Sequence, residues 1–291
     1  MGLDNLSTKR QRIAELARTK RGVALSTLHH VIDLEWLKEA YRLTRKDGAP
    51  GIDGMTAKDY AQNLEANLSD LLERIKSGRY QAPPVRRAYI PKADGSRRPL
   101  GLPTFEDKVC QRAIVMILEL VYEQEFLPCS YGFRPGRSAH QALHELRTGF
   151  MSHGLRWVID LDIVKYFDSI SHSHLRSFLD RRVTDGVIRR MIDKWLKAGV
   201  LEDGLLRHAT EGSPQGGVVS PHLGVPTPSR LKAVTVSSSL WGTAVGPIRH
   251  RHFALGAISA PAAPPAWLKE ADTDFYVGEF KRTGCRASPI C

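Results

Sequence analysis

The 291-residue sequence has only four cysteines, none in a C-x-x-C pair or beside histidines at zinc-site spacing. Their scarcity excludes a disulfide-stapled miniprotein and predicts a reduced, cytoplasmic protein. The longest apolar runs fall well short of the ~18 uncharged residues that a membrane span needs. The N-terminus MGLDNLSTKRQRIAEL has no apolar core, so we expect neither a secretory signal nor a membrane partner.

Acidic residues are also in deficit, with 31 Asp+Glu against 42 Lys+Arg and a formal net charge of +11. Basic surfaces bind phosphate backbones by releasing counterions, so this balance favours a nucleic-acid partner without establishing one. The composition changes near residue 224. Residues 225–291 hold seven of the 17 prolines and show little amphipathic periodicity. We therefore expect a divergent, poorly ordered tail there.

The first 224 residues are predicted to contain four amphipathic helices. Three begin with a capping box, in which a Ser/Thr oxygen and an acid or amide three residues later bond backbone amides. The boxes are Thr56 with Asp59, Thr104 with Asp107, and Ser138 with Gln141. The first opens one helix that continues to Ile75. The fourth helix spans about residues 185–198 and stops at Gly199.

Extended segments are predicted at residues 84–91, 156–163 and 205–210. The first precedes the turn Ala93-Asp94-Gly95, and the last follows the turn Glu202-Asp203-Gly204. Helices mixed with few strands indicate the α+β class.

Three segments carry chemistry. DLDIVKYFD (160–168) places carboxylates in an apolar strand, where an acid is costly unless it is paired or binds a hard cation such as Mg²⁺. Lys92 and Arg98 flank a glycine turn, from which both could reach one polyphosphate. Glycines on both sides of Gln215 allow close approach of a flat ligand. Each segment alone also fits a helix cap, a solvated basic hairpin or an ordinary loop.

In their order and spacing, these segments resemble the reverse transcriptases encoded by bacterial group II introns, the intron maturases. The similar blocks are RKDGAPGIDGMT (45–56), RRAYIPKADGSRRPLGLPT (86–104), SYGFRPGRSAHQAL (130–143), DIVKYFDSI (162–170) and EGSPQGGVVSP (211–221). The resemblance covers about residues 30–223.

The resemblance implies the fingers and partial palm of a right-hand polymerase, with the thumb absent. The expected divisions are a basic helical extension (1–30), fingers (31–156), partial palm (157–224) and the tail (225–291). The implied activity is Mg²⁺-dependent copying of an RNA template from a DNA primer with dNTPs. One ion activates the primer 3′-hydroxyl and the other neutralises the leaving pyrophosphate.

The resemblance also implies roles for individual residues. Asp162 is matched to the first catalytic aspartate, which binds both Mg²⁺ ions with help from the Ile163 carbonyl. Phe167 is matched to the steric gate against a ribose 2′-hydroxyl. Lys92 and Arg98 would hold the incoming triphosphate, and Gln215 would line the nucleotide site. By charge alone, the candidate contacts to intron RNA are Arg10, Arg12, Arg18, Arg134 and Arg137.

The sequence departs from the family after Leu223-Gly224, and it contains no Asp-Asp dipeptide to match the family's Tyr/Phe-Ala-Asp-Asp turn. One metal-binding aspartate does not suffice for two Mg²⁺ ions. We therefore expect a frameshifted or truncated remnant that is inactive alone. Two alternatives are a non-catalytic module that binds intron RNA for splicing, and a reverse transcriptase from a retron or CRISPR-linked system.

Overall fold

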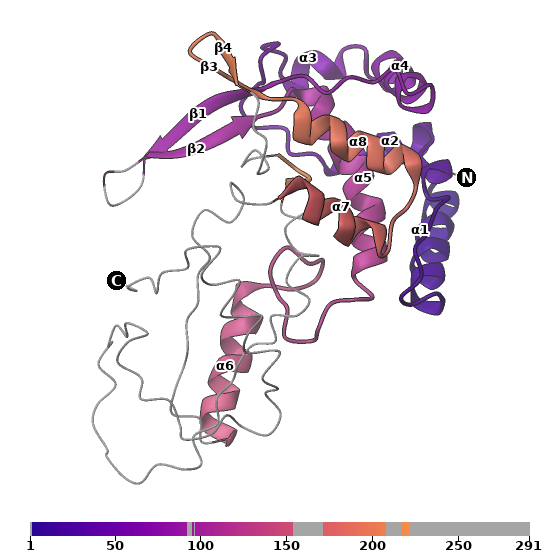
Figure 1. The fold of residues 1–291 in the computed structure, drawn as a ribbon, viewed down its shortest axis with the longest axis vertical. Helices are drawn as coiled ribbons and strands as arrows, with labels where there is room; N and C mark the ends of the chain where they lie inside the picture. The colour runs from indigo at the N-terminus through magenta and orange to yellow at the C-terminus, as the bar shows by residue number, and fades with distance from the viewer. Residues whose placement is uncertain (1, 92–94, 96, 154–170, 208–216, 221–291) are drawn as a thin grey trace.

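The computed structural model describes residues 2–91, 95, 97–153, 171–207 and 217–220 (Figure 1). This part of the chain mixes helices with one small sheet, which confirms the α+β class. The helices are α1 (Gly2–Thr19), α2 (Leu34–Leu43), α3 (Ala57–Ala61), α4 (Leu64–Lys76), α5 (Phe105–Tyr122), α6 (Ala139–His153), α7 (His172–Asp180) and α8 (Gly186–Lys197), with a 3₁₀ turn at His29–Val31. The strands are β1 (Val85–Pro91), β2 (Arg97–Leu102), β3 (Val200–Glu202) and β4 (Leu205–Arg207).

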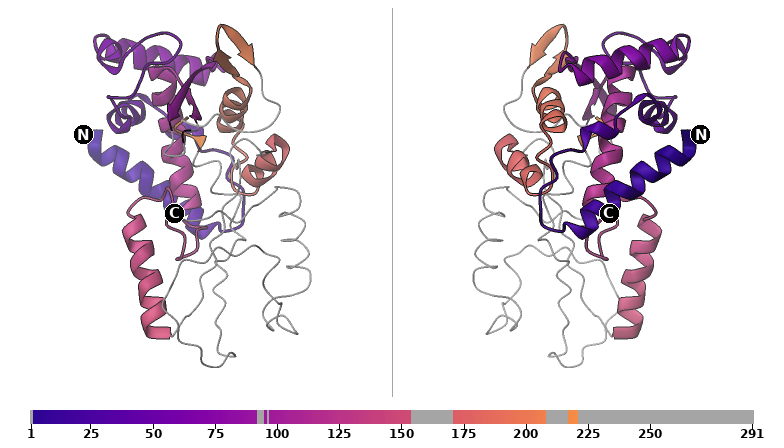
Figure 2. Two further views of the ribbon diagram at one scale, coloured as in Figure 1. Left: turned by 90° about the vertical axis from the view of Figure 1, so that its left-hand side faces the viewer. Right: turned by 90° about the vertical axis from the view of Figure 1, so that its right-hand side faces the viewer.

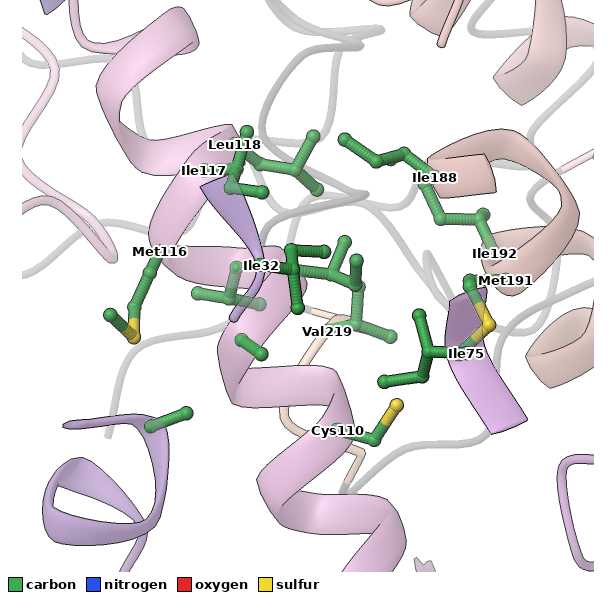
Figure 3. Close-up of a cluster of buried hydrophobic side chains, with 14 of the residues drawn as sticks. Ile32, Ile75, Cys110, Met116, Ile117, Leu118, Ile188, Met191, Ile192 and Val219 are labelled. Carbon is green, nitrogen blue, oxygen red and sulfur yellow. The ribbon is translucent and has the colours of Figure 1, made fainter. Parts of the chain in front are cut away.

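Helix α5 forms the centre of the core. Its sequence is apolar around most of its circumference, as expected for a helix packed on several sides. Helices α1 and α2 pack against it, and Trp36 of α2 donates a 2.9 Å hydrogen bond to the Ala113 carbonyl of α5. Ile75 from α4, Ile188 from α8 and Val219 belong to the same buried cluster (Figure 3). The same core therefore contains residues from both the predicted fingers (31–156) and the predicted partial palm (157–224).

The sheet has the strand order β2-β1-β3-β4. Strands β1 and β2 form an antiparallel hairpin, with Arg86 opposite Leu102 and Pro91 opposite Arg97. Strand β1 also pairs in parallel with β3, from which it is separated by more than a hundred residues (Val85 opposite Val200). Strands β3 and β4 are antiparallel. The sheet thus brings residues 200–207 next to the β1–β2 hairpin.

Several local predictions are confirmed. The Ser138–Gln141 capping box forms at the start of α6, with bonds of 2.8 and 3.3 Å. Helix α8 is followed by Gly199 at a positive φ of 80°, as a glycine helix stop requires. The turn before β4 has positive φ at both Asp203 (50°) and Gly204 (77°), the geometry that Asp-Gly favours in a two-residue hairpin.

The prediction of one helix from Thr56 to Ile75 is wrong. The Thr56–Asp59 box is present, but the helix ends at Ala61 and a second helix begins at Leu64. Asn63 lies between them outside the helical region, with φ −124° and ψ 40°. The side-chain amide Nδ2 of Asn67 donates to the Tyr60 carbonyl at 3.0 Å, which satisfies a backbone group at the break.

Two predicted segments cannot be compared with the structure. The strand at 156–163 and the tail at 225–291 both lie outside the described residues.

Candidate nucleic-acid interface

The β1–β2 hairpin carries Arg98, one of the two cations expected to hold a triphosphate. It extends from the helical core at one side of the molecule (Figure 1). The backbone of Arg98 pairs opposite Ile90, next to the tip, whereas Lys92 lies outside the described residues. Tyr89 and Ile90 near the tip are each 49% exposed. The hairpin therefore presents an accessible arm with apolar and basic residues.

The root of this hairpin is fixed by the block at residues 45–56. The Arg86 guanidinium donates to the Pro50 carbonyl at 2.9 Å, and the Lys108 ammonium donates to the Ala49 carbonyl at 2.6 Å. At Gly51 the backbone approaches so closely that an added Cβ would lie 2.5 Å from the Thr104 nitrogen. Glycine is required there, because any larger residue would push the loop away from the start of α5.

Glu202 joins the hairpin to the other end of the sheet. The Tyr89 hydroxyl donates to its carboxylate. Arg87 and Arg207 each place a guanidinium nitrogen 3.9 Å from it. This mostly buried acid thus ties β1 to the β3–β4 hairpin.

A buried carboxylate lies behind the hairpin. Asp107, in the first turn of α5, is 2% exposed. It accepts hydrogen bonds from the Tyr80 hydroxyl, from Trp195 Nε1 at 2.6 Å and from Gln111 Nε2 at 2.9 Å. Burial raises the pKa of Asp107 to about 6, although these three donors act in the opposite direction.

This network reaches the segment that follows the glycine loop. Gln111 Oε1 accepts a 3.1 Å hydrogen bond from the Val219 amide, which fixes residues 217–220 against α5. From its spacing to Thr104, Asp107 is predicted only to complete a capping box. Its amide does bond Thr104 Oγ, but its carboxylate points into the core. Helical spacing could have indicated that Asp107 is buried, since Asp107, Gln111 and Ile114 lie on one face of α5.

Helix α1 carries three of the proposed RNA contacts. Arg12 and Arg18 are exposed, and Arg10 is partly exposed. The end of α1 is held by Arg182, whose guanidinium donates to the carbonyls of Ala17, Lys20 and Val23 at 2.6–2.8 Å. Carbonyls in the last turn of a helix lack partners within it, so the bond to Ala17 makes the guanidinium a distant C-cap, and the other two bonds hold the turn that follows α1.

A second anchor lies just beyond α1. Asp185 caps α8 through the amides of Val187 and Ile188. The same carboxylate accepts from the amides of Leu28 and His29 and lies 2.8 Å from His29 Nδ1. These bonds lower the pKa of Asp185 against the opposing effect of burial. The N-terminal segment is thereby fixed to the α7–α8 region.

The two arginines of the YGFRPGRS block differ in their surroundings. Arg134 is buried and pairs with Glu123 at 2.6 Å, and it also donates to the Leu127 and Ser130 carbonyls. Arg137 is exposed and lies 5.4 Å from the Tyr131 ring centre. Arg134 thus has an internal bonding role, and Arg137 is accessible to a ligand.

The remaining predicted site residues lie outside the described residues: Lys92, Asp162, Ile163, Phe167 and Gln215. Within the described ranges, no group of three or more His, Cys, Asp or Glu side chains could hold a metal ion. Both cysteines there, Cys110 and Cys129, are free thiols. None of the helices there is long and apolar enough to cross a membrane.

Residues 90–225 match the family described as reverse transcriptase (RNA-dependent DNA polymerase). The matched region begins near the end of β1 and continues past β4. Protein YkfC of Escherichia coli strain K12 is 40% identical over 225 residues, 75% of this chain and 59% of YkfC. The group II intron-encoded protein LtrA of Lactococcus lactis subsp. cremoris is 41% identical over 160 residues, 55% of this chain and 26% of LtrA.

A third relative, the uncharacterized 91 kDa protein in the cob intron of Schizosaccharomyces pombe, is 38% identical over 156 residues, 54% of this chain and 19% of that protein. Residues 90–225 thus match the reverse transcriptase family. Together with the intron-encoded relatives, this match supports a group II intron reverse transcriptase/maturase. The chain spans 59% of the length of YkfC and 26% of LtrA.

Proposed function

We propose that this chain is an RNA-directed DNA polymerase by family whose own 291 residues bind intron RNA but do not sustain polymerisation. One observation carries the second half of the proposal, namely that the sequence has no Asp-Asp dipeptide. The accessible hairpin and the basic helix α1 support the first half. In this proposal residues 1–30 extend the RNA surface, 31–156 are fingers, 157–224 are partial palm and 225–291 are a divergent tail.

The donors available for Mg²⁺ explain the expected lack of polymerisation. Members of the family use a divalent metal, usually Mg²⁺. Asp162 and the Ile163 carbonyl supply hard oxygen atoms of the kind that Mg²⁺ prefers. A single carboxylate does not suffice for two Mg²⁺ ions. The donor set therefore does not fit a two-metal centre, and we derive no catalytic step through it.

The nucleotide contacts form a separate part of the proposal. Lys92 and Arg98 would bind the phosphates of a dNTP, while Phe167 and Gln215 would contact its sugar and base. Phosphate binding by Lys and Arg does not require a complete metal centre.

Binding of RNA tests the proposal directly. The purified chain should bind a labelled intron RNA with an affinity that falls steeply with salt, because phosphate contacts release counterions. Asp162→Ala should bind equally well. Failure of the native chain to bind RNA at low salt would reject the proposal.

A further inference from the structure

The loop between α5 and α6 presents an aromatic ring to solvent. Phe133 is 63% exposed, and its φ of 54° lies in the left-handed region. A phenylalanine occupies that region only where its surroundings hold it there, and such residues cluster at binding sites. The ring is therefore displayed outward on a constrained backbone.

The constraint comes from the neighbouring residue. Arg134 donates to Glu123 with both Nε (3.2 Å) and Nη2 (2.6 Å), and it places its guanidinium 4.8 Å from the Phe126 ring centre. Its carbonyl accepts from the Arg137 amide at 3.2 Å, in a turn where Gly136 has a positive φ of 71°. Ser138 then opens α6 through its capping box. The loop is thus bonded on both sides of Phe133.

Apolar side chains lie beside the ring. Phe133 lines a shallow pocket with Tyr122, Phe126 and Pro135. The two carboxylates at this pocket have cationic neighbours, since Glu119 lies 3.8 Å from Arg112 and Glu123 pairs with Arg134. These pairs reduce the repulsion that a polyanion would otherwise meet.

Two exposed arginines follow Phe133 along the chain. Arg137 is exposed and lies over Tyr131, and Arg147 is exposed further along α6. Helix α6 extends away from the core formed by α1, α2 and α5 in all three ribbon views (Figures 1 and 2). Single-stranded nucleic acids are bound by this combination of aromatic rings for bases and cations for phosphates.

We propose that Phe133 is a stacking platform for an unpaired RNA base, with Arg137 and Arg147 contacting the adjoining phosphates. The proposal rests on the RNA-binding function proposed above and adds a specific contact to it. It also separates the two arginines of the block, because Arg134 builds the loop and Arg137 contacts the ligand.

The test uses the full chain and a labelled oligoadenylate of about 12 nucleotides, within the usual range of single-strand site sizes. Phe133→Leu keeps an apolar side chain but removes the ring, and should weaken binding by roughly 5- to 150-fold. Phe133→Trp should restore native affinity. The matched control is Leu143→Ala, an exposed apolar residue of α6, which should change affinity less than about twofold.

Two further measurements separate stacking from folding. Phe133→Gly relieves the left-handed strain, so its thermal midpoint should equal or exceed that of the native chain while its oligoadenylate affinity falls. Affinity for duplex RNA of the same length should not change in Phe133→Leu, because paired bases are not free to stack.

The outcomes distinguish the two proposals. If the native chain binds oligoadenylate in a salt-dependent way and Phe133→Leu binds equally well, the stacking platform is wrong and the RNA-binding function stands. Equal losses for Phe133→Leu and Phe133→Trp, or for single-stranded and duplex RNA, would also reject stacking. If the native chain binds no RNA, the proposed function itself fails.

Discussion

The carboxylate of Asp107 accepts a 2.6 Å hydrogen bond from the indole of Trp195, although the two residues are 88 positions apart. Tyr80 and Gln111 bond the same carboxylate, and Gln111 in turn accepts from Val219. This buried network joins α5 and α8 to the segment that follows the glycine loop. It lies where one core spans the proposed fingers and palm.

Replacing Asp107 with leucine should lower the free energy of unfolding by about 2–5 kcal/mol, because Tyr80 and Trp195 would keep buried donors without an acceptor. Asp107→Asn retains an acceptor oxygen and should lose less. Urea denaturation of both variants checks this. A leucine variant as stable as the asparagine variant would show that the hydrogen bonds contribute little.

The same residue predicts a pH dependence of stability. Burial raises the folded-state pKa of Asp107 from 3.8 to about 6, so between these values the folded state binds more protons than the unfolded state. The contribution of Asp107 to stability is present at low pH and is lost as the pH rises through this range. Between pH 4 and pH 7, the free energy of unfolding of the native chain should fall by about 1–3 kcal/mol relative to that of the Asp107→Asn variant.

Urea denaturation of the two proteins at each pH measures this difference, and the other titrating groups cancel in the comparison. Parallel stability profiles would contradict the assignment of a raised pKa to Asp107.

Arg182 should contribute strongly to the attachment of α1. Arg182→Met removes the donor to three carbonyls in and just after the last turn of α1. It also removes the partner of the Glu125 carboxylate, which lies 2.9 Å from the guanidinium. We expect about 2–4 kcal/mol of destabilisation. Arg181→Met is the control, because Arg181 is exposed and packs only against Phe178 in the described contacts, and it should change stability by less than ~0.5 kcal/mol. Equal denaturation midpoints for the two variants would refute the capping role.

The exposed arginines of α1 should act on RNA affinity without affecting stability. Arg12→Gln and Arg18→Gln should each weaken RNA binding and reduce the slope of log affinity against log salt by about one. Arg42→Gln is the control, because Arg42 is already paired with Glu39 at 2.6 Å. Unchanged slopes in both α1 variants would place the RNA surface elsewhere.

Local signals predicted much of this fold. The capping boxes at Thr56 and Ser138 and the Asp203-Gly204 turn depend on residues only a few positions apart, and the structure contains all three. The box predicted at Thr104 forms only in part, because Thr104 accepts from the Asp107 amide while the Asp107 carboxylate bonds core residues instead. The break at Asn63 was missed because the apolar periodicity continues across it. Periodicity reports which face is buried, not whether the backbone remains helical.

Long-range pairings could not be predicted in this way. The parallel pairing of Val85 with Val200 and the hydrogen bonds to Asp107 depend on which elements meet in the core. Charge alone also grouped Arg134 with Arg137, whereas burial and the Glu123 partner distinguish them. The expected metal and nucleotide residues were assigned by resemblance, and they remain predictions.

The central claim is that this chain binds RNA but does not copy it, and primer extension tests that claim most directly. The native chain and Asp162→Ala should be compared on an annealed RNA template and DNA primer with dNTPs and Mg²⁺, with RNA binding measured in the same preparation. We predict equal salt-dependent binding and no extension by either protein. Sustained Mg²⁺-dependent extension by the native chain that is abolished in Asp162→Ala would contradict the account.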